Sequence, residues 1–574
     1  MNLTAASRTV QLLKRICDTK SSTVPFCPPA AEKRSLSFGD VLQPFERVSP
    51  ESQGIPSRHI RLFLEELQRG NDLNMQTVLI IRNGKLLCSA AYGAQRIDIP
   101  KHTFSACKSI TALAIGLLCD DGLLHPDDSM SKIFPDLLTP AASRRMRDVT
   151  VKDLLTMRSG ISFAEPQSAS EEQWLQPALT GSLMTAPGKE FHYNSINTYL
   201  LSAIVRRITD ESMSSFLQRR LFHPMGISGT LWECSPDGIE KGGWGLYIRC
   251  EDMAKLGQLI LNGGEWNGMQ LISREYLQDA LSPHVSPPPE LGEFDYGYQI
   301  WIGRKTRSFL FNGMLGQNVL GFPGSGILIV TNAGADTDYQ RSRYFEIVDR
   351  YFGGGFADTL PPDPVENEAL NEALRGFSFY SRKRLAIDET AQPFLYRSFT
   401  TAHPCAASTG LLPMFLQILH NNYSSGLISL AISTSGTLPE LIYRERDETH
   451  RLSIGLGCPS ISELCFRGNC FHVAVHGRFT HDEEDRPVFC IRINFLETPS
   501  VRVIKLILTD DGAILKQSET PGIPYLYEKL CAAARQPLLR PLLMLTAGGS
   551  DEEFLYFKAT KILSPEIQLI QDNV

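Results

Sequence analysis

Residues 103–122 read TFSACKSITALAIGLLCDDG, a short polar opening followed by a long apolar run. Good helix formers fill Ile110–Cys119 and Gly122 is a natural helix C-terminal cap, so the stretch predicts one helix. Ser105 then lies at the helix N-terminus, three residues before Lys108. Because residues three apart share a helix face, the lysine amine can reach the serine hydroxyl. The pattern therefore indicates a serine nucleophile activated by an amine.

The first turn of a helix suits both members of this pair. The positive end of the helix favours the serine alkoxide, and desolvation of a partly buried lysine lowers its pKa by penalising the ammonium form. On their own, however, the four residues fit better with a helix cap at Ser105 and a solvated Lys108. A second S-x-x-K match, Ser129–Lys132, stands in a loop rich in Pro and Asp and is set aside. The wider sequence must decide between these interpretations.

Apolar runs on both sides of this helix predict a single sheet built from distant segments. The runs 77–81 and 85–91 flank Asn83-Gly84, a dipeptide that supplies the positive φ angles of a tight hairpin turn. Helical patterns dominate from Thr103 to about Leu261. Strand-like runs then return at 298–302, 308–311, 319–322 and 326–331.

Length, charge and cysteine content bound the class of protein. At 574 residues the chain is too long for one core, since single cores stop growing near about 250–300 residues. The net charge of −7, without a Lys- or Arg-rich run, argues against nucleic acid as a partner. No window approaches the roughly 18 apolar residues of a membrane span, and the first residues lack the apolar core of a signal peptide. Thirteen irregularly spaced cysteines fit reduced thiols. We therefore expect a cytoplasmic protein that binds no membrane.

The composition changes along the chain and predicts its domains. Residues 1–45, with weak periodicity and several prolines, predict a poorly ordered extension. Residues 46–360 form the predicted catalytic domain. Residues 361–374 belong to a stretch rich in Gly, Pro and acidic residues, which is typical of an interdomain linker. Residues 375–574 predict a β-rich accessory domain, with strands expected at 427–432, 472–475, 488–494 and 501–508 and a helix at 411–420.

Four further blocks follow the helix stretch in order: VKDLLTMRSGIS, GKEFHYNSINTYLLSAIVRRITD, GGWGLYIRCEDMAKLGQLILNGGEWNGMQLIS, and DYGYQIWIG with FLFNGMLGQNVLGFPGSGILIVTNAG. Together the blocks resemble the β-lactamase-like serine hydrolase superfamily over roughly residues 47–352, including its class C β-lactamase, D-alanyl peptidase, esterase and 6-aminohexanoate-oligomer hydrolase branches. The resemblance implies an α/β (α+β) fold, with an antiparallel sheet flanked by helices and a mainly helical subdomain. It also implies that Ser105 is the acyl-accepting nucleophile and Lys108 its general base.

The second family motif, Y-x-N, corresponds to Tyr193-Asn194-Ser195. The resemblance implies that the Tyr193 phenol shuttles a proton to the leaving group. The sequence departs from the family at the third position, where serine replaces asparagine. Either Ser195 takes over that hydrogen-bonding role, or Asn194 supplies it from the neighbouring position.

The third family motif, K-T-G or H-x-G, corresponds to Phe311-Asn312-Gly313, so its cation is missing. Because that cation commonly recognises a substrate carboxylate, its replacement by Phe311 argues against penicillins and D-alanyl peptides and favours simpler esters or amides. Gly313 would let a substrate approach the strand edge. The resemblance further implies an oxyanion hole made of the backbone N–H groups of Ser105 and Met314.

Some residues have two interpretations that the sequence leaves open. The aromatic side chains Trp174, Tyr296 and Trp301 either line the substrate pocket or pack in the core. In the tail, Cys465, Cys470, His472 and His476 could form a zinc site, but their spacing is not that of a zinc finger, and buried thiols and strand histidines are the expected explanation. We expect no metal and no cofactor.

The predicted function is hydrolysis of a small ester or amide through an acyl-enzyme on Ser105. One alternative is a D-alanyl peptidase or penicillin-recognising enzyme, and another is a catalytically silent scaffold that retains the fold. The role of the tail is open: it could narrow the active-site mouth, bind a partner or mediate self-association into a homo-oligomer.

Overall fold

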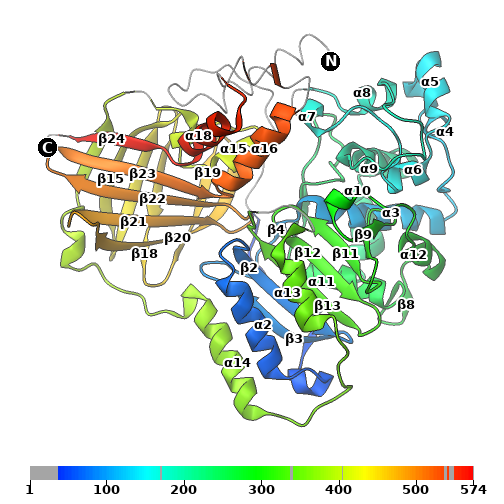
Figure 1. Ribbon diagram of the computed structural model, residues 1–574, viewed down its shortest axis with the longest axis horizontal. Helices are drawn as coiled ribbons and strands as arrows, with labels where there is room; N and C mark the ends of the chain where they lie inside the picture. The colour runs from blue at the N-terminus through cyan, green and yellow to red at the C-terminus, as the bar shows by residue number, and fades with distance from the viewer. Residues whose placement is uncertain are drawn as a thin grey trace. The chain divides into compact units, whose positions relative to one another are not determined.

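A computed structural model describes residues 36–168, 171–336, 341–403, 405–535, 540–541, 544 and 549–572 (Figure 1). Most of the predicted extension, residues 1–35, lies outside the described residues. The chain forms two compact units, one made of Leu36–Ala91 and Arg96–Arg375, the other including Tyr92–Gln95 and the chain from Gly376 onward.

The first unit is organised around an eight-stranded sheet. Its order is β1-β3-β2-β13-β12-β11-β10-β9. The strands are β1 Glu46–Arg47, β2 Met75–Arg82, β3 Lys85–Ala91, β9 Phe294–Tyr296, β10 Trp301–Gly303, β11 Phe309–Gly313, β12 Gln317–Phe322 and β13 Ile327–Ala333. Asn83 and Gly84 turn between β2 and β3 with φ angles of 50° and 72°, as the dipeptide predicted.

The sheet joins distant parts of the chain, which confirms the prediction of one sheet assembled from both sides of the helical region. Strand β2 pairs antiparallel with β13, and Ile80 lies opposite Ile329. Both residues are fully buried, as are their neighbours Leu79 and Leu328 on the opposite face. Because successive side chains point to opposite faces, both faces of the sheet's centre are covered.

Helices cover the sheet, and the chain between β3 and β9 forms a mainly helical subdomain. Helix α11, Cys250–Leu261, packs so closely that a Cβ on Gly257 would lie 2.7 Å from Val319. Helices α2, Ser57–Arg69, and α13, Arg343–Phe352, pack against each other. The other helices of this region are α3 Cys107–Asp120, α4 Met130–Ile133, α5 Pro140–Met146, α6 Val151–Leu155, α7 Glu165–Ser168, α8 Leu175–Thr180, α9 Ser195–Thr209, α10 Met213–Leu217 and α12 Arg274–Ala280.

The segment predicted as a linker, residues 361–374, is largely helical. Helix α14 spans Pro364–Phe377 and begins at a proline, whose fixed φ suits a first helical position. Leu370 on this helix is buried. The Gly, Pro and acidic residues that indicate a linker lie just before α14 and in its first turn. The apolar residues that follow them belong to the rest of the helix.

The second unit is a sheet that curls almost into a barrel. The order is β17-β16-β15-β14-β24-β23-β22-β21-β20-β18, with β19 paired to β20, and β17 contacts β19. Its strands are β14 Arg397–Thr401, β15 Leu427–Ser435, β16 Leu438–Glu445, β17 Thr449–Ser453, β18 Gly455–Leu456, β19 Ser460–Phe466, β20 Asn469–His481, β21 Pro487–Phe495, β22 Val501–Thr509, β23 Gly512–Thr520 and β24 Glu566–Gln571. Helices α15 Met414–Leu419, α16 Ile523–Arg535 and α18 Glu552–Leu563 accompany it. This agrees with the β-rich tail predicted from alternating apolar residues.

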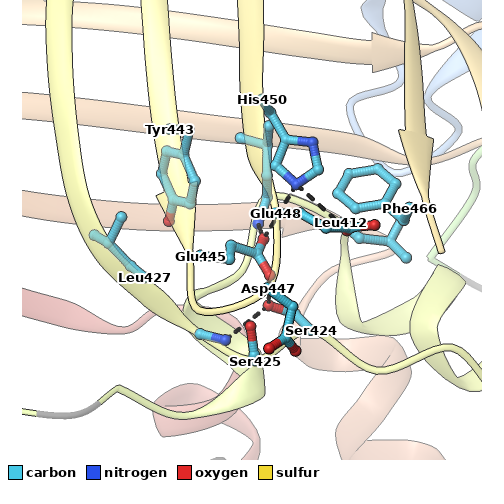
Figure 2. Close-up of polar contacts among 12 residues, drawn as sticks. Leu412, Ser424, Ser425, Leu427, Tyr443, Glu445, Asp447, Glu448, His450 and Phe466 are labelled. Atoms are coloured by element: carbon cyan, nitrogen blue, oxygen red, sulfur yellow. Dashed lines mark hydrogen bonds and ion pairs between the residues drawn. The ribbon is translucent and has the colours of Figure 1, made fainter.

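Buried carboxylates tie the helices and loops of this unit to its strands. The Glu519 side chain accepts hydrogen bonds from the backbone N–H of Met414 and Phe415, and it lies 3.0 Å from Nη1 of the equally buried Arg502. At the β16–β17 hairpin, Figure 2 shows Glu445 beside His450. One oxygen of Glu445 accepts the N–H of Leu411 at 3.0 Å. The hydrogen bonds to Glu445 and Glu519 satisfy backbone N–H groups that burial would otherwise penalise.

A disulfide links two cysteines of the second unit. Cys465 and Cys470 face each other across the β19–β20 hairpin and form a disulfide, so they are bonded to each other rather than to a metal. The expectation of thiols reduced throughout is therefore wrong for this pair.

None of the helices in the described ranges is long and apolar enough to span a bilayer.

Candidate active site

Ser105 sits in a tight turn directly before helix α3. The turn is a short 3-10 helix, Phe104–Ala106, and the α-helix begins two residues after the serine, at Cys107. Phe104 has a φ of 47°, a left-handed conformation that is unusual for a bulky residue and marks local strain next to the serine. Within residues 101–110 Ser105 is the one residue that is not fully buried. The turn therefore presents this hydroxyl at the surface of an otherwise buried segment.

Lys108 occupies the first turn of α3, and its amine is surrounded by three oxygens. The Nζ atom lies 2.9 Å from Oγ of Ser105, 2.7 Å from Oγ of Ser195 and 2.7 Å from the carbonyl oxygen of Gly243. The residue is only 2% exposed. The three-residue spacing thus brings the amine to the hydroxyl, as the helix pattern predicted, and the alternative of a solvated Lys108 is wrong.

The burial of Lys108 sets its protonation behaviour. Desolvation lowers the pKa of the Lys108 amine to about 8, against smaller opposing effects of Glu165 and Cys107. The neighbouring thiol does not compete as a base, because burial raises the pKa of Cys107 to about 12. Its sulfur contacts the carbonyl oxygens of Phe104 and Gly242 instead. Near neutral pH a useful fraction of the lysine is therefore unprotonated.

Tyr193 stands beside the serine and the lysine, two residues before helix α9. The amine of Lys108 lies 5.1 Å from the centre of the Tyr193 ring. Burial raises the pKa of the Tyr193 phenol above its usual range, and the nearby Ser105 side chain partly offsets that rise. The phenol is thus neutral near pH 7 and close to the serine hydroxyl.

Asn194 and Ser195, the two candidates for the missing asparagine, have different surroundings. The Asn194 side chain caps α9 by accepting the N–H of Ile196 at 3.0 Å, and its amide donates to the carbonyl oxygens of Ile161 and Phe163. All of its contacts are therefore structural. Ser195 is the residue whose hydroxyl meets the Lys108 amine.

Gly243 belongs to the glycine pair of the GGWG block and completes the lysine site. A Cβ at this position would lie 2.9 Å from the Cβ of Ser195 and 3.4 Å from Nζ of Lys108. Any larger residue would push the serine away from the amine. The GGWG block carries part of the family resemblance, and its two adjacent glycines before an aromatic residue were the one sequence signal for Gly243.

The third motif lies on strand β11, next to the serine turn. Phe311 is fully buried in the apolar core, and Asn312 is buried with its amide bonded to Asn318 at 2.7 Å. A Cβ on Gly313 would lie 2.2 Å from the carbonyl oxygen of Thr103. The glycine therefore admits the backbone just before Ser105, whereas we had expected it to admit substrate. Met314 follows directly, in the turn between β11 and β12.

Aromatic rings gather around Tyr193. Trp301 stacks with it at a ring separation of 5.9 Å, Tyr296 lies 6.4 Å away, and Phe191, which the sequence analysis did not single out, lies 6.5 Å away. Strand pairing puts Tyr296 directly opposite Trp301. Trp174 is not in this group, since it stacks on Trp244 and packs edge-on against Tyr199.

The second S-x-x-K match has none of these features. The Lys132 side chain is 72% exposed and pairs with Asp128 at 2.6 Å, while the hydroxyls of Ser129 and Ser131 meet each other at 3.0 Å. The match lies at the start of helix α4 rather than in the predicted loop, and these contacts do not bring its serine and lysine together.

Comparison with known proteins gives the family. Residues 66–348 match the family model described as Beta-lactamase. Protein flp of Staphylococcus aureus (strain NCTC 8325 / PS 47) is 28% identical over 180 residues, covering 29% of this chain and 36% of that protein. The 6-aminohexanoate-dimer hydrolase of Paenarthrobacter ureafaciens is 24% identical over 238 residues, covering 38% of this chain and 59% of that protein. Among solved structures, the octameric penicillin-binding protein homologue from Pyrococcus abyssi aligns with a TM-score of 0.42 and 16% identity, over 79% of this chain and 99% of that chain.

The family match contains Ser105, Lys108 and Tyr193. Residues 66–348 therefore belong to the β-lactamase-like serine hydrolase superfamily, which confirms the family predicted from the sequence for this part of the chain. The alignment spans only about a third of the staphylococcal protein, 36% of its length.

Proposed function

We propose that the protein is a serine hydrolase that cleaves an ester or amide bond through an acyl-enzyme on Ser105. The proposal is carried by the 2.9 Å contact between Nζ of Lys108 and Oγ of Ser105. General-base activation requires a buried amine of lowered pKa beside a partly exposed hydroxyl, and these two residues form that pair.

The three oxygens around the amine define how a neutral Lys108 would act. A neutral amine has two N–H groups and one lone pair. The Gly243 carbonyl can only accept a hydrogen bond, and the Ser195 hydroxyl can accept the second, so the lone pair is left for the Ser105 hydroxyl. The contacts thus orient the base, and Ser195 is a positioning residue in this scheme.

The reaction follows from these roles. Lys108 takes the Ser105 proton as the serine oxygen attacks the substrate carbonyl, and the negative charge on the carbonyl oxygen is held by the backbone N–H groups of Ser105 and Met314. The neutral Tyr193 phenol donates a proton to the leaving group and recovers one from Lys108. Water, activated by the same groups, then releases the acyl group from Ser105.

The substrate class is a small ester or amide without a required carboxylate. Phe311 stands where relatives carry a cation, and the aromatic group of Phe191, Tyr193, Tyr296 and Trp301 offers apolar surface beside the phenol. The relative named 6-aminohexanoate-dimer hydrolase supports including linear amides among the substrates tested. The positions of Asn312 and Gly313 next to the serine turn fit a supporting role at the edge of the site.

The test is covalent labelling with a fluorophosphonate, read by intact mass and peptide mapping, together with turnover of a short-chain nitrophenyl ester and a linear amide. We expect one adduct, on Ser105, that is lost in Ser105→Ala, and turnover that is lost in Lys108→Ala. The second S-x-x-K supplies matched controls, because Ser129→Ala and Lys132→Ala remove the same groups from the short helix α4, where Lys132 is exposed.

The rival functions give different results in the same experiment. A fluorescent penicillin that labels Ser105 as fast as the fluorophosphonate would favour a penicillin-recognising enzyme. A folded wild-type protein that forms no adduct and turns over no substrate would favour the silent scaffold. Self-association through the C-terminal unit also stays a proposal, and light scattering of the full chain tests it.

A further inference from the structure

The outer face of the second unit's sheet carries a cluster of basic side chains on three neighbouring strands. The strand register places His476 opposite Arg492 and Arg478 opposite Cys490 across β20 and β21, and Cys490 opposite Lys505 across β21 and β22. The alternate residues of the same strands, such as Val475, Ile491 and Ile504, belong to the buried core. Since side chains alternate between faces, the basic residues share the outer face.

A chain segment forms the opposite wall of a groove over these strands. The segment runs from Phe379 to Thr390, and the Phe379 ring packs edge-on against His476 at 5.1 Å. The N–H of Leu385 is bonded to the carbonyl oxygen of Leu456 at 2.8 Å, which fixes the segment's course. The groove has a volume of about 560 Å³, which is within the usual range for a small-molecule site.

Four cations and one carboxylate line the groove, which leaves an excess of positive charge among the described residues. Arg382, Arg478, Arg492 and Lys505 line it, and none of the four forms an ion pair within the part of the chain that the structure describes. Asp388 is the one carboxylate among the described lining residues, and it bonds to the N–H of Thr390.

Some surface cations elsewhere on the same unit are paired. Arg451 pairs with Glu440, Arg467 with Asp447 and Arg486 with Asp482. In the groove, by contrast, four cations lie together and none has an ion-pair partner among the described residues, so they repel one another.

Two other features of the groove point to a bound molecule. His476 has a buried Nδ1 atom with no hydrogen-bond partner among the described residues. Apolar surface adjoins the cations, since Phe379, Leu385 and Val503 also line the groove and Leu385 is 55% exposed. The site thus combines several cations, a ring nitrogen without a hydrogen-bond partner and apolar walls. These features suit a ligand that has an anionic group attached to an apolar part.

We propose that this groove binds a small soluble organic anion, with its carboxylate, sulfonate or phosphate group held by Arg478, Arg492 and Lys505 and its apolar part against Phe379 and Leu385. The volume fits one molecule of this size, and the charge selects its sign. The site is separate from the serine site and does not depend on the proposed hydrolase activity.

The test compares two fluorescent probes that differ in charge, anilinonaphthalene sulfonate and its neutral parent phenylnaphthylamine. Each is titrated into the full chain and into a triple variant, Arg478→Gln, Arg492→Gln and Lys505→Gln. The control variant, Arg451→Gln, Arg467→Gln and Arg486→Gln, removes three paired cations from the same unit. Circular dichroism and thermal unfolding verify that both variants are folded.

We expect one saturable sulfonate site in the wild type and the control, weakened by at least about tenfold in the triple variant and weakened by added salt. The neutral probe should show no such difference between proteins. Unchanged sulfonate affinity in the triple variant, or an equal loss in the control, would overturn the proposal. The proposal would also be overturned if the protein sedimented with phosphatidylglycerol vesicles in a salt-dependent way but did not bind the monomeric sulfonate. The site would then recognise a lipid surface.

Discussion

The Lys108 amine contacts the Ser195 hydroxyl at 2.7 Å, although the two residues are 87 positions apart in the sequence. Ser195 stands where relatives of this family carry an asparagine, so the contact connects the first motif to the altered position of the second. In the proposed mechanism, this hydroxyl accepts one N–H of the neutral amine and so directs its lone pair to Ser105.

Ser195→Ala should therefore lower kcat/KM for a nitrophenyl ester by about 10–100-fold, because the amine loses an orienting partner while the nucleophile remains. Steady-state kinetics and the rate of fluorophosphonate labelling measure the loss. Ser202→Ala is the matched control, since Ser202 is a buried serine on the same helix whose hydroxyl has no hydrogen-bond partner among the described residues. Equal rates for the two variants would remove Ser195 from the mechanism.

The pair of Ser105 and Lys108 could be predicted from the sequence because its spacing is local: the 3-10 turn that holds Ser105 leads directly into α3 and brings residues three apart to the same side. The strands of both units could be predicted for a similar reason, since apolar alternation and the Asn83-Gly84 turn are local signals. The third hydrogen-bond partner of the Lys108 amine, the carbonyl oxygen of Gly243, could not be predicted from local signals. It comes from 135 positions away, and only the folded chain brings it to the amine.

The roles of Asn194 and Gly313 show a second limit. The sequence leaves Asn194 as one of two candidates for the missing hydrogen-bonding group and predicts that Gly313 admits substrate. Asn194 instead caps a helix, and Gly313 makes room for the Thr103 carbonyl. A motif fixes where a residue lies in the fold, whereas its contacts depend on neighbours from other segments.

The pH dependence of the reaction follows from Lys108. The base must be unprotonated, and burial lowers the pKa of the Lys108 amine to about 8, so the active fraction increases as the pH rises. We expect kcat/KM for a neutral ester to rise with pH and to level off above about 8. Cys107→Ala should lower that midpoint only slightly, because Cys107 has a small effect on the Lys108 pKa and a thiol whose own pKa is raised to about 12 does not titrate in this range. A profile that is flat from pH 6 to 9 would contradict the assignment of Lys108 as the base.

Tyr193→Phe should reduce turnover by about 100–1000-fold while the protein stays as stable as the wild type, because the ring remains and only the proton donor is lost. The comparison is Tyr276→Phe, which removes a buried hydroxyl bonded to the Ala112 carbonyl at 2.6 Å. That variant should lose stability by about 1 kcal/mol and keep its turnover. The reverse pattern, with turnover intact in Tyr193→Phe, would show that another group protonates the leaving group.

Gly313→Ala should destabilise the catalytic unit by about 1–3 kcal/mol, since its Cβ would lie 2.2 Å from the Thr103 carbonyl oxygen and must displace the turn that holds Ser105. Urea unfolding followed by tryptophan fluorescence measures this, because all five tryptophans lie in the first unit. Gly324→Ala is the control, as a Cβ there meets nothing within 4 Å. If the two variants unfold at the same urea concentration, the close approach does not constrain the turn.

The second unit should depend on the buried pair of Arg502 and Glu519. Their side chains are fully buried with Nη1 and Oε2 3.0 Å apart, and Glu519 also accepts the N–H groups that begin helix α15. Glu519→Gln leaves the guanidinium uncompensated in the interior, so the free energy of unfolding of this unit should fall by about 3–5 kcal/mol. Calorimetry of the full chain measures the shift, while tryptophan emission, which reports on the first unit, should be unchanged.

The control Glu566→Gln breaks a half-exposed pair with Lys516 and should cost less than about 1 kcal/mol, because solvent already screens that pair. A loss in Glu519→Gln no larger than in the control would mean that the helix contacts, rather than the charge pair, stabilise this end of the sheet.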